Sequence, residues 1–477
     1  MMTTEDRDTI PKLVRRNYDR WAQRTAMRIK KSEAWRQYSW RKYYENVKYC
    51  SLGLVSLGLE RGDVVCIIGD NEPEWFWAEF ATQAAGGIAT GILVDSVFSE
   101  AKYIAEHSDA KFAIVKGQEQ AGKFLEIKDG LPAVEKIIYW DAPGLEGGEH
   151  PALIGFTEVV RMGREYEESH PGLFEENVEE GSGDDTACIY YISETPGLPR
   201  GARLSHRALI SAAAGFINRH PTDETDDLVS DFPAAWAGSS FFTTMPHLLT
   251  GACLMFSGRP ETVTEATRES APGFVTDGPR RWEGLASEVQ KKMTDAHPLR
   301  RLVYKWFLAV GHRIADFGLQ GKSPNILWRA LYRMANLFLF RPLKEKLGLS
   351  KVRFVVTGSS GLSLDTLRLI RAIGIEPRQV YASTEAGLIA CHARGETDFG
   401  SAGRPAVNAE VRVSDGGELL VRSQSMFDGY LKDPERTAAV LIDGWYHTGD
   451  GVSINDTGHL VLLGRLDRRG ELRSDIK

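Results

Sequence analysis

Short apolar runs alternate with helical patterns in the first third of the chain, and this alternation constrains the fold more than any other feature. The expected helices and strands, in chain order, are 43–57, 64–68, 74–85, 88–94, 100–107 and 112–115. Strands that alternate with helices build βαβ units, whose strands pair in parallel within one sheet. The sequence therefore predicts an α/β fold that contains parallel sheets.

The length of the chain and the changes in its residue pattern predict several subdomains. The chain has 477 residues, of which 42% are apolar. It is therefore too long for a single hydrophobic core and has enough apolar residues for about two or three. We expect a first α/β subdomain at 1–185, a second at 186–388 and a small β-rich, barrel-like subdomain at 389–463. The polar, acidic stretch 175–185 is predicted to be a connector between the first two.

Several later elements follow from the same patterns. Ser205 is expected to cap a helix over 208–216, and 365–373 is expected to form another helix. The expected strands are 187–192, 252–256, 273–276, 353–357, 411–413 and 418–422.

Composition excludes some classes of protein. The net charge of −7 argues against a nucleic-acid-binding protein, because such surfaces carry net positive charge. The five cysteines are scattered and never form a Cys-x-x-Cys pair, which predicts buried, reduced thiols. The N-terminus is polar and lacks the apolar core of a secretory signal, so we expect a cytoplasmic protein.

The segment 299–346 combines positive charge with many aromatic side chains. It holds ten Lys or Arg residues against Asp316 and Glu345. One interpretation is a pair of amphipathic helices that pack through their aromatic faces, with solvated Lys and Arg residues opposite. The other is a peripheral contact with a membrane surface, for which this composition is also typical.

Three short motifs occur in a fixed order: Tyr-Ile-Ser-Glu-Thr-Pro-Gly-Leu-Pro-Arg-Gly at 191–201, Tyr-Ala-Ser-Thr-Glu at 381–385 and Trp-Tyr-His-Thr-Gly-Asp at 445–450. A loop rich in Ser, Thr and Gly offers hydroxyl and backbone N–H groups to phosphate. A Thr-Glu pair offers a hydroxyl group and a carboxylate that can bind a metal ion, and an Asp can accept hydrogen bonds from ribose hydroxyls. Together the motifs predict a nucleotide site.

The order and the residues of these motifs, with Gly464-Arg465 after the last, resemble those of the superfamily of adenylate-forming enzymes, in particular its long-chain fatty acyl-CoA synthetases. The resemblance covers nearly the whole chain. It implies two α/β subdomains plus the β-rich one, and an AMP-forming long-chain fatty acid–CoA ligase that uses ATP, Mg²⁺ and CoA. Residues 464–477 would form the hinge and the start of a small C-terminal domain, which we expect to be missing.

The resemblance also assigns residues to the phosphate loop. Ser193, Thr195, Gly197 and Gly201 match the ATP-binding residues of the family, and Arg200 replaces its Lys as the catalytic cation. Two positions depart from the pattern, Glu194 and Pro196. A carboxylate at 194 would repel a phosphate charge 4 Å away by about 4 kcal/mol at an effective dielectric near 20.

The second and third motifs carry further implied roles. Tyr381 would stack on adenine beside Gly358 and Ser359, which resemble the adenine-side loop. Thr384 would contact phosphate and Glu385 would bind Mg²⁺, both as catalytic residues. The remaining implied roles are ribose binding by Asp450 with Arg465, a hinge at Asp467, and the acyl pocket at Trp236, where the family has His.

Two alternatives remain open at this point. The departures at Glu194 and Pro196 are compatible with a catalytically impaired homologue that binds a nucleotide or an acyl-adenylate. The same scaffold is also compatible with a ligase for another acid, or with acyl transfer to a carrier protein. The expected partners on the main hypothesis are small molecules: fatty acid, ATP and CoA.

Overall fold

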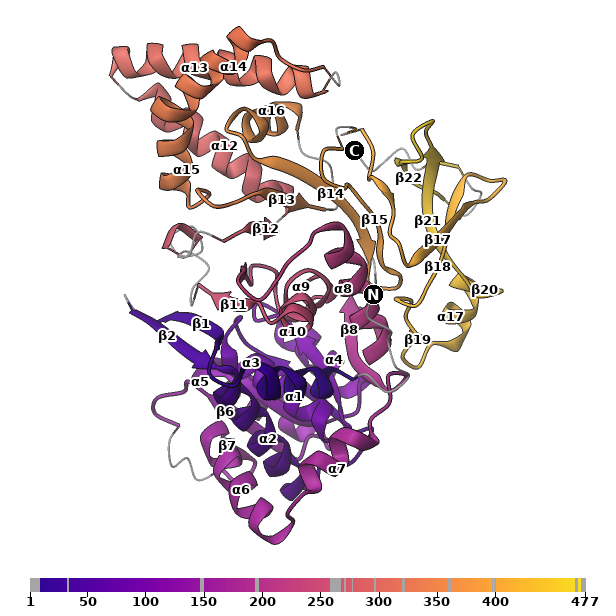
Figure 1. Ribbon diagram of the computed structural model, residues 1–477. Coiled ribbons are helices and arrows are strands. Elements are labelled where there is room, and N and C mark those ends of the chain that lie inside the picture. The colour runs from indigo at the N-terminus through magenta and orange to yellow at the C-terminus, as the bar shows by residue number, and fades with distance from the viewer. Residues whose placement is uncertain are drawn as a thin grey trace.

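The computed structural model shows a chain that is built around four β-sheets in its described part (Figure 1). The structure describes residues 9–31, 34–145, 150–193, 197–257, 267–269, 272–276, 278–295, 297–319, 322–358, 363–396, 398, 400–467 and 471–472. The predicted α/β class with a β-rich C-terminal part is confirmed by this architecture.

The largest sheet has eight strands in the order β19-β9-β8-β4-β3-β5-β6-β7. The strands from β8 to β7 along this order are parallel, whereas β9 and β19 pair antiparallel at one end. Their bounds are β3 Val64–Ile68, β4 Ile88–Ile92, β5 Ala110–Lys116, β6 Lys136–Trp140, β7 Leu153–Gly155, β8 Thr186–Ile192, β9 Arg200–Ser205 and β19 Gly429–Tyr430.

Helices cover both faces of this sheet, as the continuous apolar pattern of β3 requires. Val64, Cys66 and Ile68 pack in one apolar cluster with helices α4 and α5, whereas Val65 and Ile67 pack in another with α2 and α3. The helices of this part are α1 Ile10–Trp21, α2 Trp40–Ser56, α3 Pro73–Ala84, α4 Phe98–His107, α5 Gly117–Ile127, α6 Phe156–Ser169 and α7 Leu173–Glu180.

The expected connector at 175–185 is wrong for its first half, because α7 extends to Glu180. Phe174 and Val178 lie one helical turn apart and are both buried. The ammonium group of Lys48 lies 2.8 Å from the Glu175 carboxylate. Tertiary contacts therefore stabilise a helix in a stretch whose polar composition alone predicts a loop.

A second sheet joins distant parts of the chain in the order β10-β11-β1-β2. The N-terminal strand β1 Thr25–Lys31 pairs with β2 Ala34–Ser39 on one side and with β11 Cys253–Phe256 on the other. Strand β11 pairs in turn with β10 Asp227–Val229. Helices α8 His206–Arg219, α9 Ala237–Ser239 and α10 Met245–Thr250 lie between these strands in the sequence. Ser205 accepts a hydrogen bond from the Ala208 N–H and caps α8, as predicted.

The third sheet has the order β12-β13-β14-β15-β16. Its strands are β12 Phe274–Thr276, β13 Phe354–Thr357, β14 Glu376–Ser383, β15 Gly387–Cys391 and β16 Arg404–Pro405. A group of helices packs beside it: α12 Pro279–Thr294, α13 Pro298–Leu319, α14 Ile326–Ala335, the wider turn η4 Asn336–Phe340, α15 Arg341–Leu347 and α16 Leu364–Ala372. Figure 1 shows α13 and α14 at the end of the molecule opposite α6 and α7.

The fourth sheet is antiparallel and forms the β-rich part that the sequence predicts. Its strands are β17 Ala409–Val413, β18 Glu418–Ser423, β20 Leu441–Ile442, β21 Trp445–Ile454 and β22 Leu460–Arg465, with helix α17 Pro434–Val440. Because β19 from this region pairs with β9, the fourth sheet is tied to the first. The ranges 1–185, 186–388 and 389–463 stay predictions, and β8 and β9 at the start of the second range belong to the first sheet.

Candidate active site

The first motif lies at the end of β8 and the start of β9. Tyr191 pairs with Gly201 across these two strands. A methyl group on Gly201 would lie 2.8 Å from Cγ2 of Ile189, so close packing of the sheet already requires glycine there. Gly197 has φ +152°, a conformation that favours glycine. Glu194, Thr195 and Pro196 lie outside the described residues.

A cavity of about 340 Å³ opens beside this strand pair. Ser193, Thr384 and Trp236 all line it, although they come from the first motif, the second motif and the segment before α9. Trp236 retains 50% of its surface exposed to solvent. A methyl group on Gly91 would lie 2.5 Å from Cα of Ala235, so the strand and the 235–238 segment are in close contact at this wall. The structure therefore brings three of the sequence-predicted residues to one cavity.

Tyr381, Asp450 and Arg465 form a second group of predicted residues. The Tyr381 hydroxyl on β14 donates a hydrogen bond to Oδ2 of Asp450 on β21. Nη1 of Arg465 on β22 lies 2.9 Å from Oδ1 of the same carboxylate. Burial, together with the nearby Asp450 charge, raises the pKa of Tyr381 well above its usual value. Both oxygens of Asp450 are thus oriented by neighbours from different strands.

Glu385 lies in the turn between β14 and β15 and is 8% exposed. Its Oε1 accepts a hydrogen bond of 2.8 Å from the Tyr430 hydroxyl. The Arg200 guanidinium carbon lies 4.4 Å from the centre of the Tyr430 ring. Tyr430 therefore contacts two predicted catalytic residues, Glu385 and Arg200, and it is a residue that sequence reasoning missed. Only the pairing of β19 with β9 brings it there, so no local pattern could have revealed it.

Glu418 is the second residue that sequence reasoning missed. Its carboxylate binds Nδ1 of His447 at 2.9 Å and the Gly449 N–H at 2.9 Å. The Thr448 hydroxyl donates to the Leu419 carbonyl at 2.8 Å. The third motif is therefore held along β18, which sets the position of Asp450 at its end.

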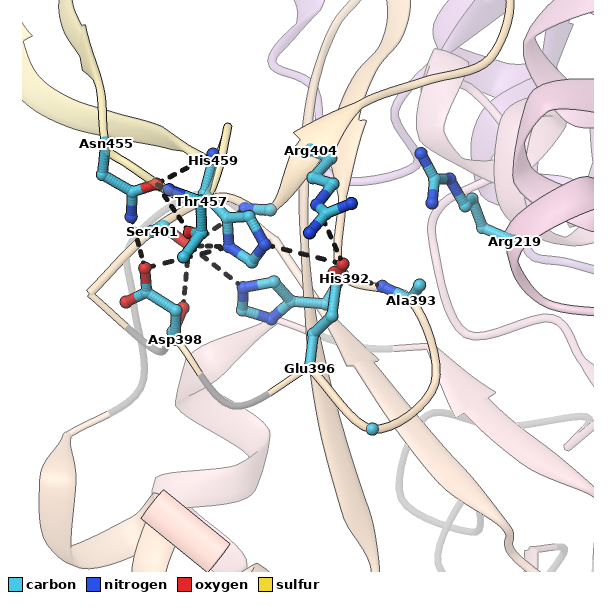
Figure 2. A network of polar contacts seen from close by, with 12 residues as sticks. Arg219, His392, Ala393, Glu396, Asp398, Ser401, Arg404, Asn455, Thr457 and His459 are labelled. Carbon is cyan, nitrogen blue, oxygen red and sulfur yellow. Dashed lines mark hydrogen bonds and ion pairs between the residues drawn. The ribbon is translucent and has the colours of Figure 1, made fainter. Parts of the chain in front are cut away.

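A buried polar network holds the far end of the β21–β22 hairpin. The Ser401 hydroxyl donates to the Asp398 carbonyl at 2.8 Å and lies 2.9 Å from Nδ1 of His459 and 3.3 Å from Nε2 of His392. Figure 2 shows both imidazole rings directed at Ser401, with Glu396 and Asn455 beside them. His392 also accepts a hydrogen bond from the N–H of Gln379 on β14. The network thus connects the strand that carries Tyr381 with the hairpin that carries Asp450 and Arg465.

The remaining predicted residues lie elsewhere. Gly358 follows β13, where a methyl group would approach Cγ2 of Val380 at 3.3 Å, and Ser359 is outside the described residues. Asp467 follows β22 and accepts a hydrogen bond from the Glu471 N–H at 2.9 Å. Gly358 and Asp467 are outside the described lining of the cavity.

Comparison with known proteins finds relatives that are similar to this chain in sequence. It is 26% identical over 475 residues to the long-chain-fatty-acid–CoA ligase ACSBG2 of Xenopus laevis, with 96% of this chain and 63% of that protein covered. It is 26% identical over 450 residues to the long-chain-fatty-acid–CoA ligase heimdall of Drosophila melanogaster, with 91% and 65% covered. The chain thus spans less than two thirds of the length of these relatives.

Solved structures share the fold at low sequence identity. The inhibitor-bound N-terminal domain of FACL13 from Mycobacterium tuberculosis matches with a TM-score of 0.70 and 20% identity, over 96% of this chain and all of that one. The long-chain-fatty-acid-CoA ligase FadD1 from Archaeoglobus fulgidus matches with a TM-score of 0.73 and 16% identity, over 98% and 86%. The model of the family described as AMP-binding enzyme matches residues 14–431. The chain therefore belongs to the AMP-binding enzyme family.

Proposed function

We propose that the whole protein is an AMP-forming long-chain fatty acid–CoA ligase. Such an enzyme joins the acid to AMP with release of pyrophosphate and then transfers the acyl group to the thiol of CoA with release of AMP. The observation that carries the proposal is the convergence of separate motifs, since Ser193 and Thr384 line one cavity while Tyr381, three residues before Thr384, binds Asp450. Family membership and the names of the relatives give this convergence its meaning.

The nucleotide would lie along the carboxyl ends of β8 and β14. We assign the ribose hydroxyls to Asp450, whose two oxygens are already oriented by Tyr381 and Arg465. Tyr381 would contact adenine, next to Gly358 and Ser359. The phosphates would meet Ser193, Thr195, Gly197, Gly201, Arg200 and Thr384, because hydroxyls, backbone N–H groups and a guanidinium group stabilise their negative charge. These roles are proposals that rest on the geometry and on the resemblance.

The residues present fit a magnesium ion that arrives with the nucleotide. The described residues contain no group of three or more His, Cys, Asp or Glu side chains that could hold a metal by itself. Mg²⁺ in nucleotide sites commonly needs only one or two carboxylates, because phosphates and water supply the other ligands. Glu385 supplies such a carboxylate, with Oε1 oriented by the Tyr430 hydroxyl. When bound, the ion would neutralise phosphate charge.

The acid would enter the cavity beside Trp236. Leu93, Ile104, Ala235 and Ala237 give its lining an apolar character, which suits an alkyl chain. The proposed small-molecule partners are therefore a fatty acid, ATP and CoA. A cytoplasmic location and a peripheral membrane contact through 299–346 belong to the same proposal.

The decisive test is a calorimetric titration of this chain with a non-hydrolysable long-chain acyl-adenylate analogue in the presence of Mg²⁺. We expect saturable binding that Asp450→Ala weakens by roughly tenfold or more, since two oriented hydrogen-bond acceptors are lost. Asp415→Ala is the matched control, because Asp415 is an exposed Asp in the turn between β17 and β18. No binding by a folded sample would instead favour the impaired homologue.

The identity of the acid needs a second titration series. Adenylate analogues with a long alkyl, a short alkyl and an aryl group share the AMP part and differ only in what enters the cavity. The proposal requires the long-chain analogue to bind tightest. A preference for the aryl analogue would contradict the fatty-acid assignment while leaving the nucleotide site intact. The acyl acceptor is tested separately, by comparing CoA with a carrier protein as acceptor in the full-length protein.

A further inference from the structure

One wall of the cavity beside Trp236 is a segment without helix or strand. It comprises residues 230–236, between the end of β10 and the start of α9, and we call it the wall segment. Ala235 and Trp236 at its end line the cavity. Backbone N–H and C=O groups outside helices and sheets need other partners to hold them in place. The position of this wall therefore depends on the groups that bind the wall segment.

Asn71, in the loop between β3 and α3, binds the wall segment through its side chain. Its Nδ2 donates to the carbonyl oxygen and the hydroxyl oxygen of Ser230, each at 3.0 Å, and to the Phe232 carbonyl at 2.7 Å. Its Oδ1 accepts a hydrogen bond of 2.9 Å from the Ala234 N–H. An amide group offers both donors and an acceptor at its end, which this pattern of partners requires. One side chain thus holds three residues of the wall segment.

The backbone that carries Asn71 is itself fixed to the first sheet. Its neighbour Glu72 is 3% exposed. The Glu72 carboxylate lies 2.7 Å from Nζ of Lys116 and accepts a hydrogen bond of 3.3 Å from Nε1 of Trp140. Lys116 and Trp140 are the last residues of β5 and β6. Asn71 therefore starts from a point that two strands hold, and it transmits the position of the first sheet to the wall segment.

A second cavity, of about 300 Å³, lies behind the wall segment. Asn71, Ser230 and Ala234 belong to its lining, whereas Leu93 and Ala235 line both cavities. The wall segment is thus a partition between two cavities. Because open space lies on both sides of this partition, the hydrogen bonds from Asn71 contribute more to its position than they would at a residue packed into a filled core.

We propose that Asn71 is a positioning residue for the acyl group of the substrate. Its four hydrogen bonds fix the wall segment and thereby place Ala235 and Trp236 against the alkyl chain. Asn71 is outside the described lining of the first cavity, so it acts through these two residues. Attraction between apolar groups depends on close contact, so a small shift of the wall weakens acyl binding. The inference rests on the proposed function, because it takes this cavity as the site of the acyl group.

Calorimetric titrations with two ligands test the proposal. Asn71→Asp keeps the size of the side chain, but its carboxylate replaces the N–H donors that face the carbonyl oxygens of Ser230 and Phe232. We expect the affinity for the long-chain acyl-adenylate analogue to fall roughly tenfold or more, while the affinity for AMP stays within about twofold. Asn71→Ala should change the ratio of the two affinities in the same direction.

Asn408 provides a matched control. Its Nδ2 also donates to three acceptors, the carbonyl and hydroxyl oxygens of Ser211 at 2.8 Å each and the Ser425 hydroxyl at 3.2 Å. Asn408 is outside the described linings of both cavities. We expect Asn408→Asp to lower the free energy of unfolding in urea, as Asn71→Asp does, but to keep the parent's ratio of the two affinities. A purely structural role of an asparagine is thereby separated from positioning.

Gly91→Ala displaces the same wall from its other side. The added methyl group would lie 2.5 Å from Cα of Ala235, so the wall segment has to move. We expect the ratio of the two affinities to shift in the same direction as in Asn71→Asp. Gly122→Ala is the control, because a methyl group there meets no atom within 4 Å. This pair decides the proposal if the Asn71 variants do not fold.

Hydrogen exchange of the ligand-free protein gives a second measurement, which needs no ligand. Asn71→Asp should raise the exchange rate of the backbone amides in 230–236 roughly tenfold or more, because the hydrogen bonds that hold the segment are lost. Asn408→Asp should leave these rates at the parent's values.

Three results would overturn the positioning role. The first is an unchanged ratio of affinities in the Asn71 variants or, if these do not fold, in Gly91→Ala. The second is an equal shift of the ratio in Asn408→Asp, and the third is unchanged exchange in 230–236. A parent protein that binds neither AMP nor the analogue would count against the proposed function instead, and the exchange rates then decide by themselves whether Asn71 holds the wall segment.

Discussion

The hydroxyl group of Tyr381 donates a hydrogen bond to Asp450, although 69 residues separate the two in the sequence. The bond joins β14 of the third sheet to β21 of the fourth. Arg465 binds the other oxygen of the same carboxylate. Two sheets therefore share one side of the proposed ribose site, and its shape depends on how they are held together.

Removing the Tyr381 hydroxyl should weaken nucleotide binding. In Tyr381→Phe the ring remains for adenine, while Asp450 loses one of its two orienting partners. Loss of one hydrogen bond is worth about 1 kcal/mol, or roughly a fivefold rise in the AMP dissociation constant by calorimetry. Tyr44→Phe is the control, since Tyr44 also donates to a carboxylate, that of Glu175. Equal effects of the two variants would contradict a local role for Tyr381.

Loss of the Tyr430 hydroxyl should reduce the gain in ATP affinity that Mg²⁺ provides. Tyr430→Phe keeps the ring next to Arg200 but frees Oε1 of Glu385 from its hydrogen-bond donor. We expect the gain in ATP affinity that Mg²⁺ provides to fall by roughly tenfold, because a hydrogen bond to a charged group is worth about 1.5–3 kcal/mol.

The measurement for Tyr430 is a pair of ATP titrations, with Mg²⁺ and with EDTA. Tyr139→Phe serves as the control, because its hydroxyl donates to the Leu145 carbonyl far from the motifs. An unchanged ratio of the two affinities in Tyr430→Phe would show that Tyr430 does not position a magnesium ligand.

The network around Ser401 should stabilise the β21–β22 hairpin. In Ser401→Ala the ring nitrogens of His392 and His459 that face Ser401 lose their hydrogen bonds to its hydroxyl group. Loss of a hydrogen bond costs about 1 kcal/mol, so we expect a lower free energy of unfolding in urea. Ser453→Ala, at an exposed position of β21, should change it little. If the two variants are equally stable, the network does not hold the hairpin.

Glu79 makes stability depend on pH. Burial raises the pKa of Glu79 to about 7, although its hydrogen bond from Cys188 works in the opposite direction. The folded protein therefore binds more protons than the unfolded chain between about pH 4.5 and pH 7. The contribution of Glu79 to stability is fully present below the lower value and is lost as pH rises through the upper one.

Glu79→Gln should remove this dependence. Between pH 5 and pH 8, the free energy of unfolding of the parent protein should fall by roughly 2 to 3 kcal/mol more than that of the variant. Urea titrations at both values of pH give the comparison, with Glu435→Gln at an exposed position of α17 as the control. Parallel pH profiles of the parent and Glu79→Gln would refute a role for this carboxyl group.

The sequence by itself determined the α/β architecture and the places of the three motifs. Apolar periodicity is local, so 64–68 and 112–115 predict β3 and β5, and Ser205 predicts the start of α8. The motifs predict a nucleotide site because their residue types carry the needed groups. The individual roles, from Ser193 to Asp467, stay predictions.

Only the tertiary structure decided what surrounds the motifs and what faces solvent. Tyr430 reaches Glu385, and Glu418 reaches His447, through strand pairings between segments that are far apart in the sequence. Helix α7 depends on the burial of Phe174 and Val178, and composition alone indicated a connector. The aromatic pattern of 299–346 is compatible both with packing between helices and with contact with a membrane surface. Only three-dimensional contacts could show which of these side chains are buried and which are exposed, because burial depends on neighbours that are far away in the sequence.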